Sequence, residues 1–123
     1  MNAVTIAKAY LDALTGGDYK ALLQLFASDA VVLSPLYGEQ PATAFYQKLL
    51  EDTRNSELTF LDVFTNESGR RVSLNFRYRW TMANGLVSEF DCVDIFDIDE
   101  NGKITRLKII YDTARTRPAF HQL

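Results

Sequence analysis

Residues that carry metal and covalent chemistry are scarce in this sequence. Cys92 is the only cysteine, and His121, in the C-terminal tail, is the only histidine. One cysteine excludes an intrachain disulfide, and a single tail histidine provides neither a His-based metal site nor a base for a Ser-His-Asp triad or a cysteine nucleophile. We therefore interpret Cys92 as an inert buried cysteine.

Phosphate-binding and calcium-binding patterns are missing as well. Gly16-Gly17-Asp18 fits a turn between two helices rather than a Gly-rich phosphate loop. The run Asp97–Gly102 imitates the start of a calcium loop, but Lys108 stands at the twelfth position, where glutamate is needed. We expect a β-turn there, and neither a metal nor a cofactor in this protein.

Excess positive charge and long apolar runs are also absent. The formal net charge is −3, so the composition favours neither nucleic acid nor an anionic membrane surface as a partner. No apolar run approaches the ~20 residues that span a bilayer, and the N-terminus does not read as a signal peptide. Together with the single cysteine, the lack of a signal peptide and of a membrane span predicts a reduced, cytoplasmic compartment.

Apolar and aromatic residues, by contrast, are plentiful. The chain has 123 residues, of which 47% are hydrophobic, with eight Phe, six Tyr and one Trp. This length predicts a single domain over residues 1–123. So many rings suit an aromatic-lined cavity, although packing of an ordinary core would also use them.

Capping residues and apolar spacing predict three helices. Asn2 is expected to cap the first helix, which places Ile6, Tyr10 and Leu14 on one face. The chain between the second and third helices should form a short strand, and residues 34–41 should be irregular. The expected helices are Ala3–Thr15, Tyr19–Ala27 and Ala42–Thr53, and the strand is Val31–Leu33.

Alternating apolar and polar residues predict strands in the rest of the chain. The pattern directs Arg77 and Arg79 outward, opposite to the apolar residues between them. Three helices followed by an antiparallel meander is an α+β pattern. The expected strands are Leu58–Phe64, Val72–Met82, Val87–Ile98 and Lys103–Tyr111.

The turn at Asn84-Gly85 leaves two hairpin registers open. A two-residue turn pairs Trp80 with Glu89, whereas a three-residue turn or a bulge pairs Trp80 with Phe90 and Phe76 with Asp94. We favour the second register because it keeps the apolar residues together.

Two polar residues stand where apolar ones are expected. Tyr10 lies on the apolar face of the first helix, and Asp94 shares a strand face with Cys92 and Phe96. A buried carboxylate is costly unless it is paired, protonated or in a wet cavity. Asp94 is therefore the first candidate for chemistry, unless a bulge turns it outward to solvent. If its surroundings are dry, burial should raise its pKa, and a tyrosine donor should partly oppose this.

The chain resembles the SnoaL-like and ketosteroid isomerase-like branch of the nuclear transport factor 2-like superfamily. Each motif is loose, but together their order and spacing carry the resemblance over nearly the whole chain. The motifs are residues 10–18, residues 25–31, and Val93–Phe96 followed by Asn101–Ile104. The resemblance implies a cone, formed by a curved antiparallel sheet wrapped around three N-terminal helices as in cystatin-like folds. The cone encloses a mostly apolar pocket. Members include enzymes and non-catalytic proteins, so fold alone does not settle the function.

Residue by residue, the resemblance offers partial matches to known chemistries. Tyr10 and Asp94 fall on the tyrosine and the protonated aspartate that polarise a carbonyl in ketosteroid isomerase, where the protein raises the pKa of that aspartate. The base position holds Ser34, so steroid isomerase activity is not expected. The acid/base position of the polyketide cyclases corresponds to Ile109, and the inward arginine of the epoxide hydrolases has no evident counterpart.

Three functional hypotheses follow. In the first, the pocket binds an apolar molecule with one polar oxygen, and acid/base catalysis there would use Asp94 and Tyr10. In the second, the protein is a non-catalytic accessory or scaffold dimer with a relic pocket. In the third, it is a true isomerase or cyclase that uses a base not matched here. Besides Tyr10, Asp94, Leu14, Leu49 and Phe76, the expected lining and positioning residues are Ser34, Tyr37, Phe45, Tyr78, Trp80, Phe90, Leu107, Ile109 and Tyr111.

The outer face of the sheet is the expected site of self-association. Val93 and Ile95 alternate away from the pocket, and the strand Leu58–Phe64 has apolar residues on both faces. Exposed together, they would form a large apolar patch. We therefore expect a two-fold homodimer, unless the tail Thr113–Leu123 covers this strand.

Overall fold

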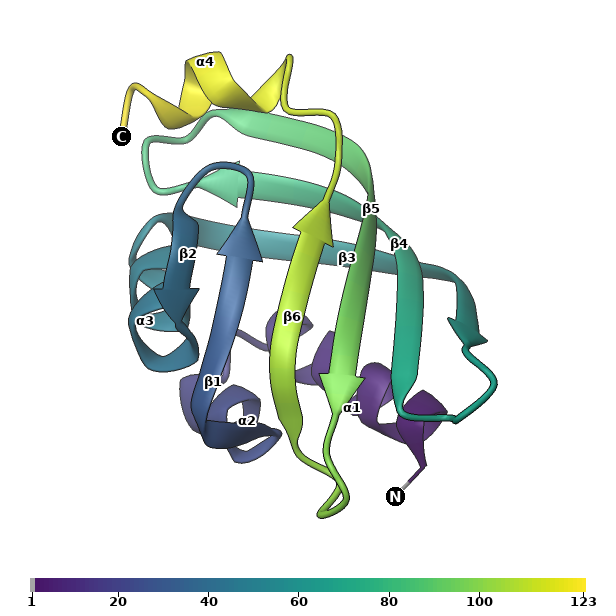
Figure 1. Ribbon diagram of the computed structural model, residues 1–123. Helices are drawn as coiled ribbons and strands as arrows, with labels where there is room; N and C mark the ends of the chain where they lie inside the picture. Colours follow the sequence, from purple (N-terminus) through teal and green to yellow (C-terminus); the bar gives the residue numbers. More distant parts are fainter. Residues whose placement is uncertain (1) are drawn as a thin grey trace.

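The computed structural model describes residues 2–123, in which a curved six-stranded sheet is packed against helices (Figure 1). Helices α1, α2 and α3 lie behind the sheet in this view, and the short α4 lies across its upper end. The sheet order is β2-β1-β6-β5-β4-β3. In chain order the elements are α1 (Ala3–Thr15), α2 (Tyr19–Gln24), β1 (Phe26–Ser34), β2 (Gly38–Pro41), α3 (Ala42–Glu51), β3 (Thr53–Thr65), β4 (Arg71–Met82), β5 (Val87–Ile98), β6 (Ile104–Ile110) and α4 (Thr116–Phe120).

The α+β class with a curved, unclosed sheet is confirmed, but the prediction of a wholly antiparallel sheet is wrong. Strand β1 pairs in parallel with β6, whereas the other neighbouring strands are antiparallel. Residue alternation indicates where a strand lies and which face it buries. It does not indicate which distant strand will be the neighbour, so the mixed sheet was not visible in the sequence.

Helix α1 forms where the sequence predicts it. The Asn2 side chain accepts a hydrogen bond from the Thr5 amide at 2.8 Å, which satisfies one free donor of the first turn. Ile6, Tyr10 and Leu14 recur every four residues and are buried together. Tyr10 is thereby directed into the interior from the centre of the helix.

Some element boundaries differ from the prediction. Helix α2 is shorter than expected because the chain after Gln24 turns into β1, where Phe26 pairs with Ile104 of β6. The segment expected to be irregular contains β2, which pairs with the end of β1. Helix α3 ends at Glu51 and β3 begins at Thr53, opposite Met82. Helix α4 was not expected from the sequence.

The β4–β5 hairpin adopts neither predicted register. Its loop has three residues, with Gly85 in the left-handed region at φ 86°, and the Met82 amide donates to the Leu86 carbonyl at 2.9 Å. Trp80 consequently lies opposite Ser88, two residues from the favoured pairing. A shift of two residues keeps every side chain on its predicted face. This register also sets Arg77 opposite Asp91, where they form an ion pair at 3.2 Å.

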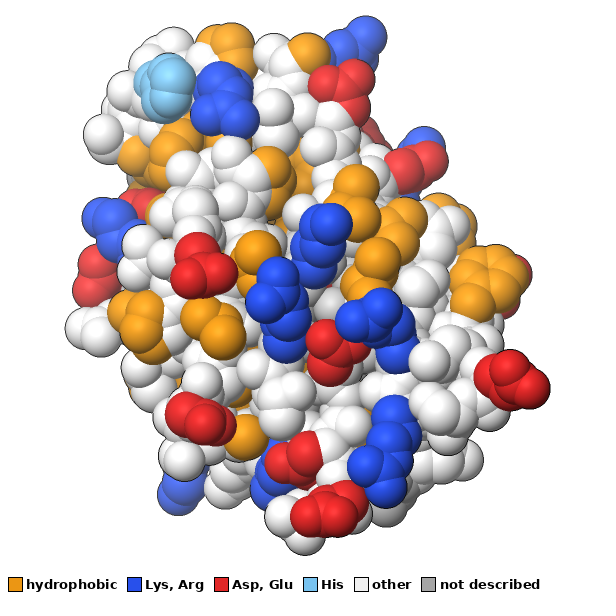
Figure 2. All heavy atoms as spheres, in the orientation of Figure 1, with side chains coloured by type: hydrophobic (Ala, Val, Ile, Leu, Met, Phe, Trp, Pro, Cys, Tyr) orange, Lys and Arg blue, Asp and Glu red, His pale blue; other side chains and the backbone are white. Residues whose placement is uncertain are grey.

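The outer face of the sheet carries both charges and exposed apolar side chains (Figure 2). Phe64 is 59% exposed and Ile110 43%. Helix α4 packs at the start of β5, where the Thr116 and Ser88 hydroxyls lie 2.6 Å apart. The alternative to self-association, in which the tail covers the strand at Leu58–Phe64, is therefore wrong. Within residues 2–123, none of the helices has the length and apolar character that a bilayer crossing needs.

Candidate functional site

A cavity of about 40 Å³ lies between the inner face of the sheet and helices α1 and α3. A volume of roughly 10–15 Å³ on this measure holds one water molecule, so the cavity has room for a few waters or a very small organic group. Pockets for drug-sized ligands have volumes of roughly 300–1,000 Å³. The cavity is lined by Tyr10, Leu14, Ser34, Tyr37, Phe45, Leu49, Phe76, Tyr78, Trp80, Phe90, Cys92, Asp94, Ile109 and Tyr111.

The structure brings all but one of the expected lining residues to this cavity. Leu107 is the exception. Its side chain is fully buried in the core, where it lies between Val32 and Phe96 in the sheet register. Leu107 shares a face with Ile109 but lies two residues closer to the start of β6. Cys92, interpreted above as an inert buried cysteine, lines the cavity beside Asp94.

Asp94 points into the cavity and is 1% exposed. The irregularity of β5 lies between Asp97 and Ile98, so it does not turn Asp94 outward. Within the described chain, its one side-chain hydrogen bond comes from the Cys92 thiol, at 3.2 Å to Oδ1. Burial raises the pKa of Asp94 to about 7, and the thiol partly opposes this rise. The rise is as expected, but the opposing donor is a thiol rather than a tyrosine.

Tyr10 lines the same cavity, but its hydroxyl is paired with Tyr46. The two hydroxyl oxygens are 2.7 Å apart, and either group can be the donor. Within the described chain, no direct hydrogen bond joins Tyr10 to Asp94. Burial raises the pKa of Tyr10 well above its ordinary value, and the nearby Tyr46 and Asp94 add to the rise. Both tyrosines are therefore neutral hydrogen-bonding groups at physiological pH.

Sequence reasoning missed Tyr46, although a signal for it was present. On α3, Tyr46 follows Ala42 by four residues and precedes Leu49 by three, and all three are buried. This is the spacing of one helical face. A hydroxyl on that face needs an internal partner, and Tyr10 was already expected inside on another helix.

Three further polar side chains of the wall are tied to residues behind it. Tyr37 donates to Asp52 Oδ2 at 2.7 Å, Trp80 donates to Thr53 at 2.8 Å, and the Tyr78 hydroxyl lies 2.9 Å from that of Ser56. Asp52 is itself buried and has Lys48 at 3.5 Å. These bonds fix the aromatic walls and leave Tyr37 and Trp80 with no hydrogen to donate to a ligand.

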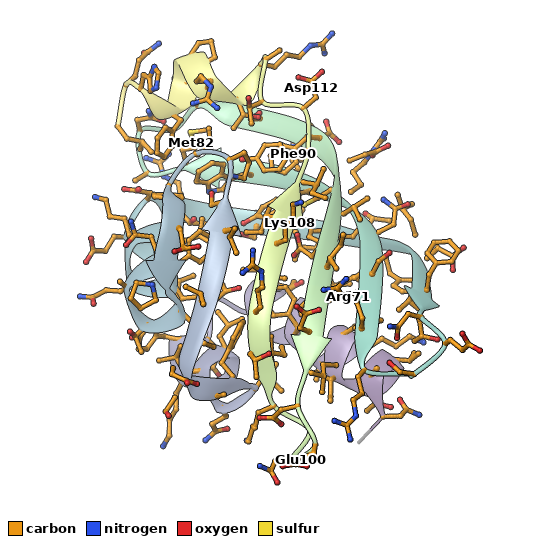
Figure 3. All side chains as sticks on the ribbon, viewed as in Figure 1. Arg71, Met82, Phe90, Glu100, Lys108 and Asp112 are labelled. Atoms are coloured by element: carbon orange, nitrogen blue, oxygen red, sulfur yellow. The ribbon has the colours of Figure 1, made fainter. Side chains whose placement is uncertain are left out.

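Ser34 and Tyr111 retain donor capacity. Ser34 Oγ accepts hydrogen bonds from the amides of Leu36 and Tyr37, at 3.2 and 3.1 Å. Its two lone pairs are thereby occupied, and its own hydrogen remains available. Tyr111 stacks on Phe90 with ring centroids 3.9 Å apart, and in the described chain its hydroxyl makes no side-chain hydrogen bond. Figure 3 shows Phe90 in the upper half of the molecule, below α4.

Helix α4 closes the end of the molecule at which Tyr37 lies. The Phe120 ring meets that of Tyr37 edge-on, with centroids 5.0 Å apart. Arg117 donates to the Pro35 carbonyl at 3.0 Å. The C-terminal segment thus holds the turn that carries Tyr37 against the sheet.

The site contains no set of metal ligands. Across residues 2–123, no three His, Cys, Asp or Glu side chains gather in a way that could hold an ion. The lining also contains no Lys, Arg or His. A single carboxyl and a few hydroxyls remain to orient a ligand.

Comparisons with known proteins agree with this architecture. Residues 7–107 match the family described as SnoaL-like domain. None of the curated proteins matches the sequence. Among solved structures, a candidate polyketide cyclase from Xanthomonas campestris is 23% identical, with 94% of each chain covered and a TM-score of 0.81.

Two further solved structures are similar to the chain. The Δ5-3-ketosteroid isomerase from a Mycobacterium species is 21% identical over 92% of this chain and 95% of its own, with a TM-score of 0.77. A Mycobacterium tuberculosis protein, in complex with estradiol-17β-hemisuccinate, is 17% identical over 91% and 95%, also with a TM-score of 0.77. At these identities the likeness shows the fold.

Proposed function

This chain belongs to the SnoaL-like domain family, and we propose that it is a small-molecule pocket protein whose ligand is apolar and carries one polar oxygen. One observation carries the proposal: the buried Asp94 carboxyl faces an aromatic cavity and has one thiol as its side-chain partner in the described chain. Its second oxygen is available to a ligand. An apolar lining with few convergent polar groups is the usual make-up of a ligand site.

Acid/base chemistry in this pocket would use Asp94 and Tyr10. With a pKa of about 7, Asp94 is present both as an acid and as a base at neutral pH. When Tyr46 donates to Tyr10, the Tyr10 hydrogen is free to polarise a ligand oxygen. Ser34 would orient the ligand with its free hydroxyl hydrogen, and Tyr37 with its ring. This is the chemistry of isomerase, cyclase or hydrolase reactions.

Ketosteroid isomerisation is not included in this proposal. Ser34 occupies the position of the base, and a serine hydroxyl held by two amides is not a carboxylate base. The purified protein should therefore not turn over a β,γ-unsaturated ketosteroid. Ser34→Asp restores the carboxyl, and weak activity in that variant would indicate that the rest of the site is competent.

The second candidate is a non-catalytic accessory or scaffold protein. The small cavity, about 40 Å³, and the internal pairing of Tyr37, Tyr78 and Trp80 favour it. A ligand larger than a few atoms has to displace part of the aromatic wall.

We further propose that a second copy of the chain covers the outer face of the sheet. Phe64, Val93, Ile95 and Ile110 lie there among balanced ion pairs, so two such faces meet without net repulsion. Light scattering at micromolar concentration should give twice the 14.0 kDa chain mass. Val93→Glu with Ile95→Lys should release folded monomer. A wild-type mass of one chain would contradict the dimer.

Ligand binding is tested by the fluorescence of Trp80, which is the only tryptophan and lines the cavity. We expect a saturable change with cyclopentanone and a weaker one with methylenecyclopentane, which has the same shape without the oxygen. The affinity for cyclopentanone should exceed that for methylenecyclopentane by about three- to tenfold, the contribution of one hydrogen bond. Asp94→Leu should abolish this difference. Equal binding of both ligands by wild type, or saturation by neither, would overturn the proposed ligand class.

A further inference from the structure

Among the residues that the structure describes, the Asp94 carboxyl has no positively charged partner. The ion pairs of the described chain involve Asp52, Asp97, Asp91, Glu57 and Glu89. The titratable groups around Asp94 are the tyrosines of α1, α3 and β4 and the segment after β6, together with the thiol on its own strand: Tyr10, Tyr46, Tyr78, Tyr111 and Cys92. These groups are neutral or become negative, so residues 2–123 supply no counterion for the ionised carboxylate.

The walls around this carboxyl are mainly aromatic rings. Phe76, Tyr78 and Trp80 follow one another on the inner face of β4, with adjacent centroids 6.2 and 6.3 Å apart. Phe90 lies 5.3 Å from Tyr78 and is stacked on Tyr111. The faces of such rings attract cations, more strongly where water is excluded. Among the described residues, the cavity therefore has no cation to pair with Asp94, and its aromatic lining favours the binding of a cation.

We propose that this cavity holds a small alkylammonium ion, such as a methylated amine, with Asp94 as its counterion and the rings of β4 and β5 as its walls. The proposal shares the pocket of the proposed function but assigns it a second ligand class. The small volume, about 40 Å³, favours a compact cation. Anionic ligands are disfavoured because they would meet Asp94 without any Lys, Arg or His in the lining.

The two ligand classes require opposite protonation states of Asp94. An ammonium ion binds the carboxylate, so it lowers the pKa of Asp94 and releases a proton when it binds near neutral pH. Its affinity should rise as the pH increases through about 7. A neutral ketone accepts a hydrogen bond from the carboxylic acid, so its affinity should fall over the same interval. The sign of the pH dependence thus distinguishes the two classes.

The test uses the whole chain, with tetramethylammonium as the probe because its charge does not change with pH. Trp80 fluorescence is followed at pH 5.5 and 8.5, at constant ionic strength set with sodium chloride, with tert-butanol as a neutral molecule of similar size. With a pKa of about 7, Asp94 is about 3% ionised at pH 5.5, so affinity should rise by up to about thirtyfold at pH 8.5. The affinity for tert-butanol should not rise.

Asp94→Asn should abolish ammonium binding at pH 8.5. The matched control is Asp91→Asn, the same change on the outward face of the same strand, which should bind like wild type. The pH slope of the wild-type protein tests the proposal even if Asp94→Asn does not fold. Ammonium binding without a pH slope, or retained by folded Asp94→Asn, overturns the proposal. If cyclopentanone binds and tetramethylammonium does not, the ammonium inference fails alone. If neither binds, the proposed function fails with it.

Discussion

Asp91 and Asp94 lie on the same strand, three residues apart, and their surroundings differ in almost every physical respect. Asp91 faces solvent and pairs with Arg77 at 3.2 Å. Asp94 faces the interior, accepts one hydrogen bond from a thiol and has its pKa raised to about 7 by burial. The outer face pairs Arg71, Arg77 and Arg79 with carboxylates of neighbouring strands. On the inner face, the Asp94 carboxyl has no counterion among the described residues. That contrast is the reason for proposing a ligand site on the inner face.

The largest difference between the two faces should be in packing. Phe96 is fully buried and lies edge-on to Tyr10, with ring centroids 5.0 Å apart, while the neighbouring Ile95 is half-buried on the outer face. Phe96→Ala should lower the free energy of unfolding by about 3–5 kcal/mol, and Ile95→Ala by about 1 kcal/mol. Urea unfolding at submicromolar protein measures both. Equal losses would contradict the assignment of inner and outer faces.

The second-largest effect should be on how the free energy of unfolding depends on pH. The pKa of Asp94 rises from 3.8 to about 7 on folding, so between these values the folded chain binds a proton that the unfolded chain releases. The contribution of Asp94 to stability is therefore present at pH 4 and lost as the pH rises through 7. Asp94→Asn should stabilise the protein at pH 8.5 by up to about 4 kcal/mol and change little at pH 4.

Unfolding curves of wild type and Asp94→Asn at the two pH values test this expectation. A pH-independent difference between the two proteins would show that Asp94 is not a buried acid.

A smaller effect is expected from the hydroxyl pair behind the cavity. Tyr46→Phe removes the partner of Tyr10 and leaves a buried hydroxyl unpaired, which should cost about 1–2 kcal/mol. The control is Tyr19→Phe, whose exposed hydroxyl donates to the Thr43 carbonyl and should matter little. If the hydroxyls pair as described, Tyr46→Phe should also change the binding of oxygen-bearing ligands. In thermal unfolding, Tyr46→Phe should have a clearly lower midpoint than Tyr19→Phe.

The smallest effect should come from the outer ion pair. Arg77 and Asp91 are both more than half exposed, so solvent screens their attraction. Asp91→Asn should therefore change the free energy of unfolding by less than about 1 kcal/mol. The difference should shrink further in high salt. A loss as large as that of Phe96→Ala would mean that the pair contributes to the core.

Prediction from sequence succeeded where periodicity determines the answer. The alternation along β4 and β5 correctly assigned the faces of Asp94, Arg77 and Arg79, and even a wrong hairpin register preserved them because the error was two residues. The polar capping residue Asn2 gave α1 its correct start.

Prediction failed where the outcome depends on contacts between distant segments. The parallel pairing of β1 with β6 joins residues far apart in the chain, and so does the hydroxyl pair of Tyr10 and Tyr46. Cavity volume depends on how far each ring extends, which spacing does not reveal. Leu107 has the right periodicity for the cavity wall but lies in the packed part of the core.

The most direct test of this account is the titration of the Asp94 carboxyl carbon by NMR in the wild-type protein, assigned with Asp94→Asn. We expect a midpoint near pH 7, well above the ordinary value of 3.8, because the carboxyl is buried in the cavity with no counterion among the described residues. A midpoint at or below 4 would contradict it, since that would mean that the carboxylate is solvated or paired with a cation.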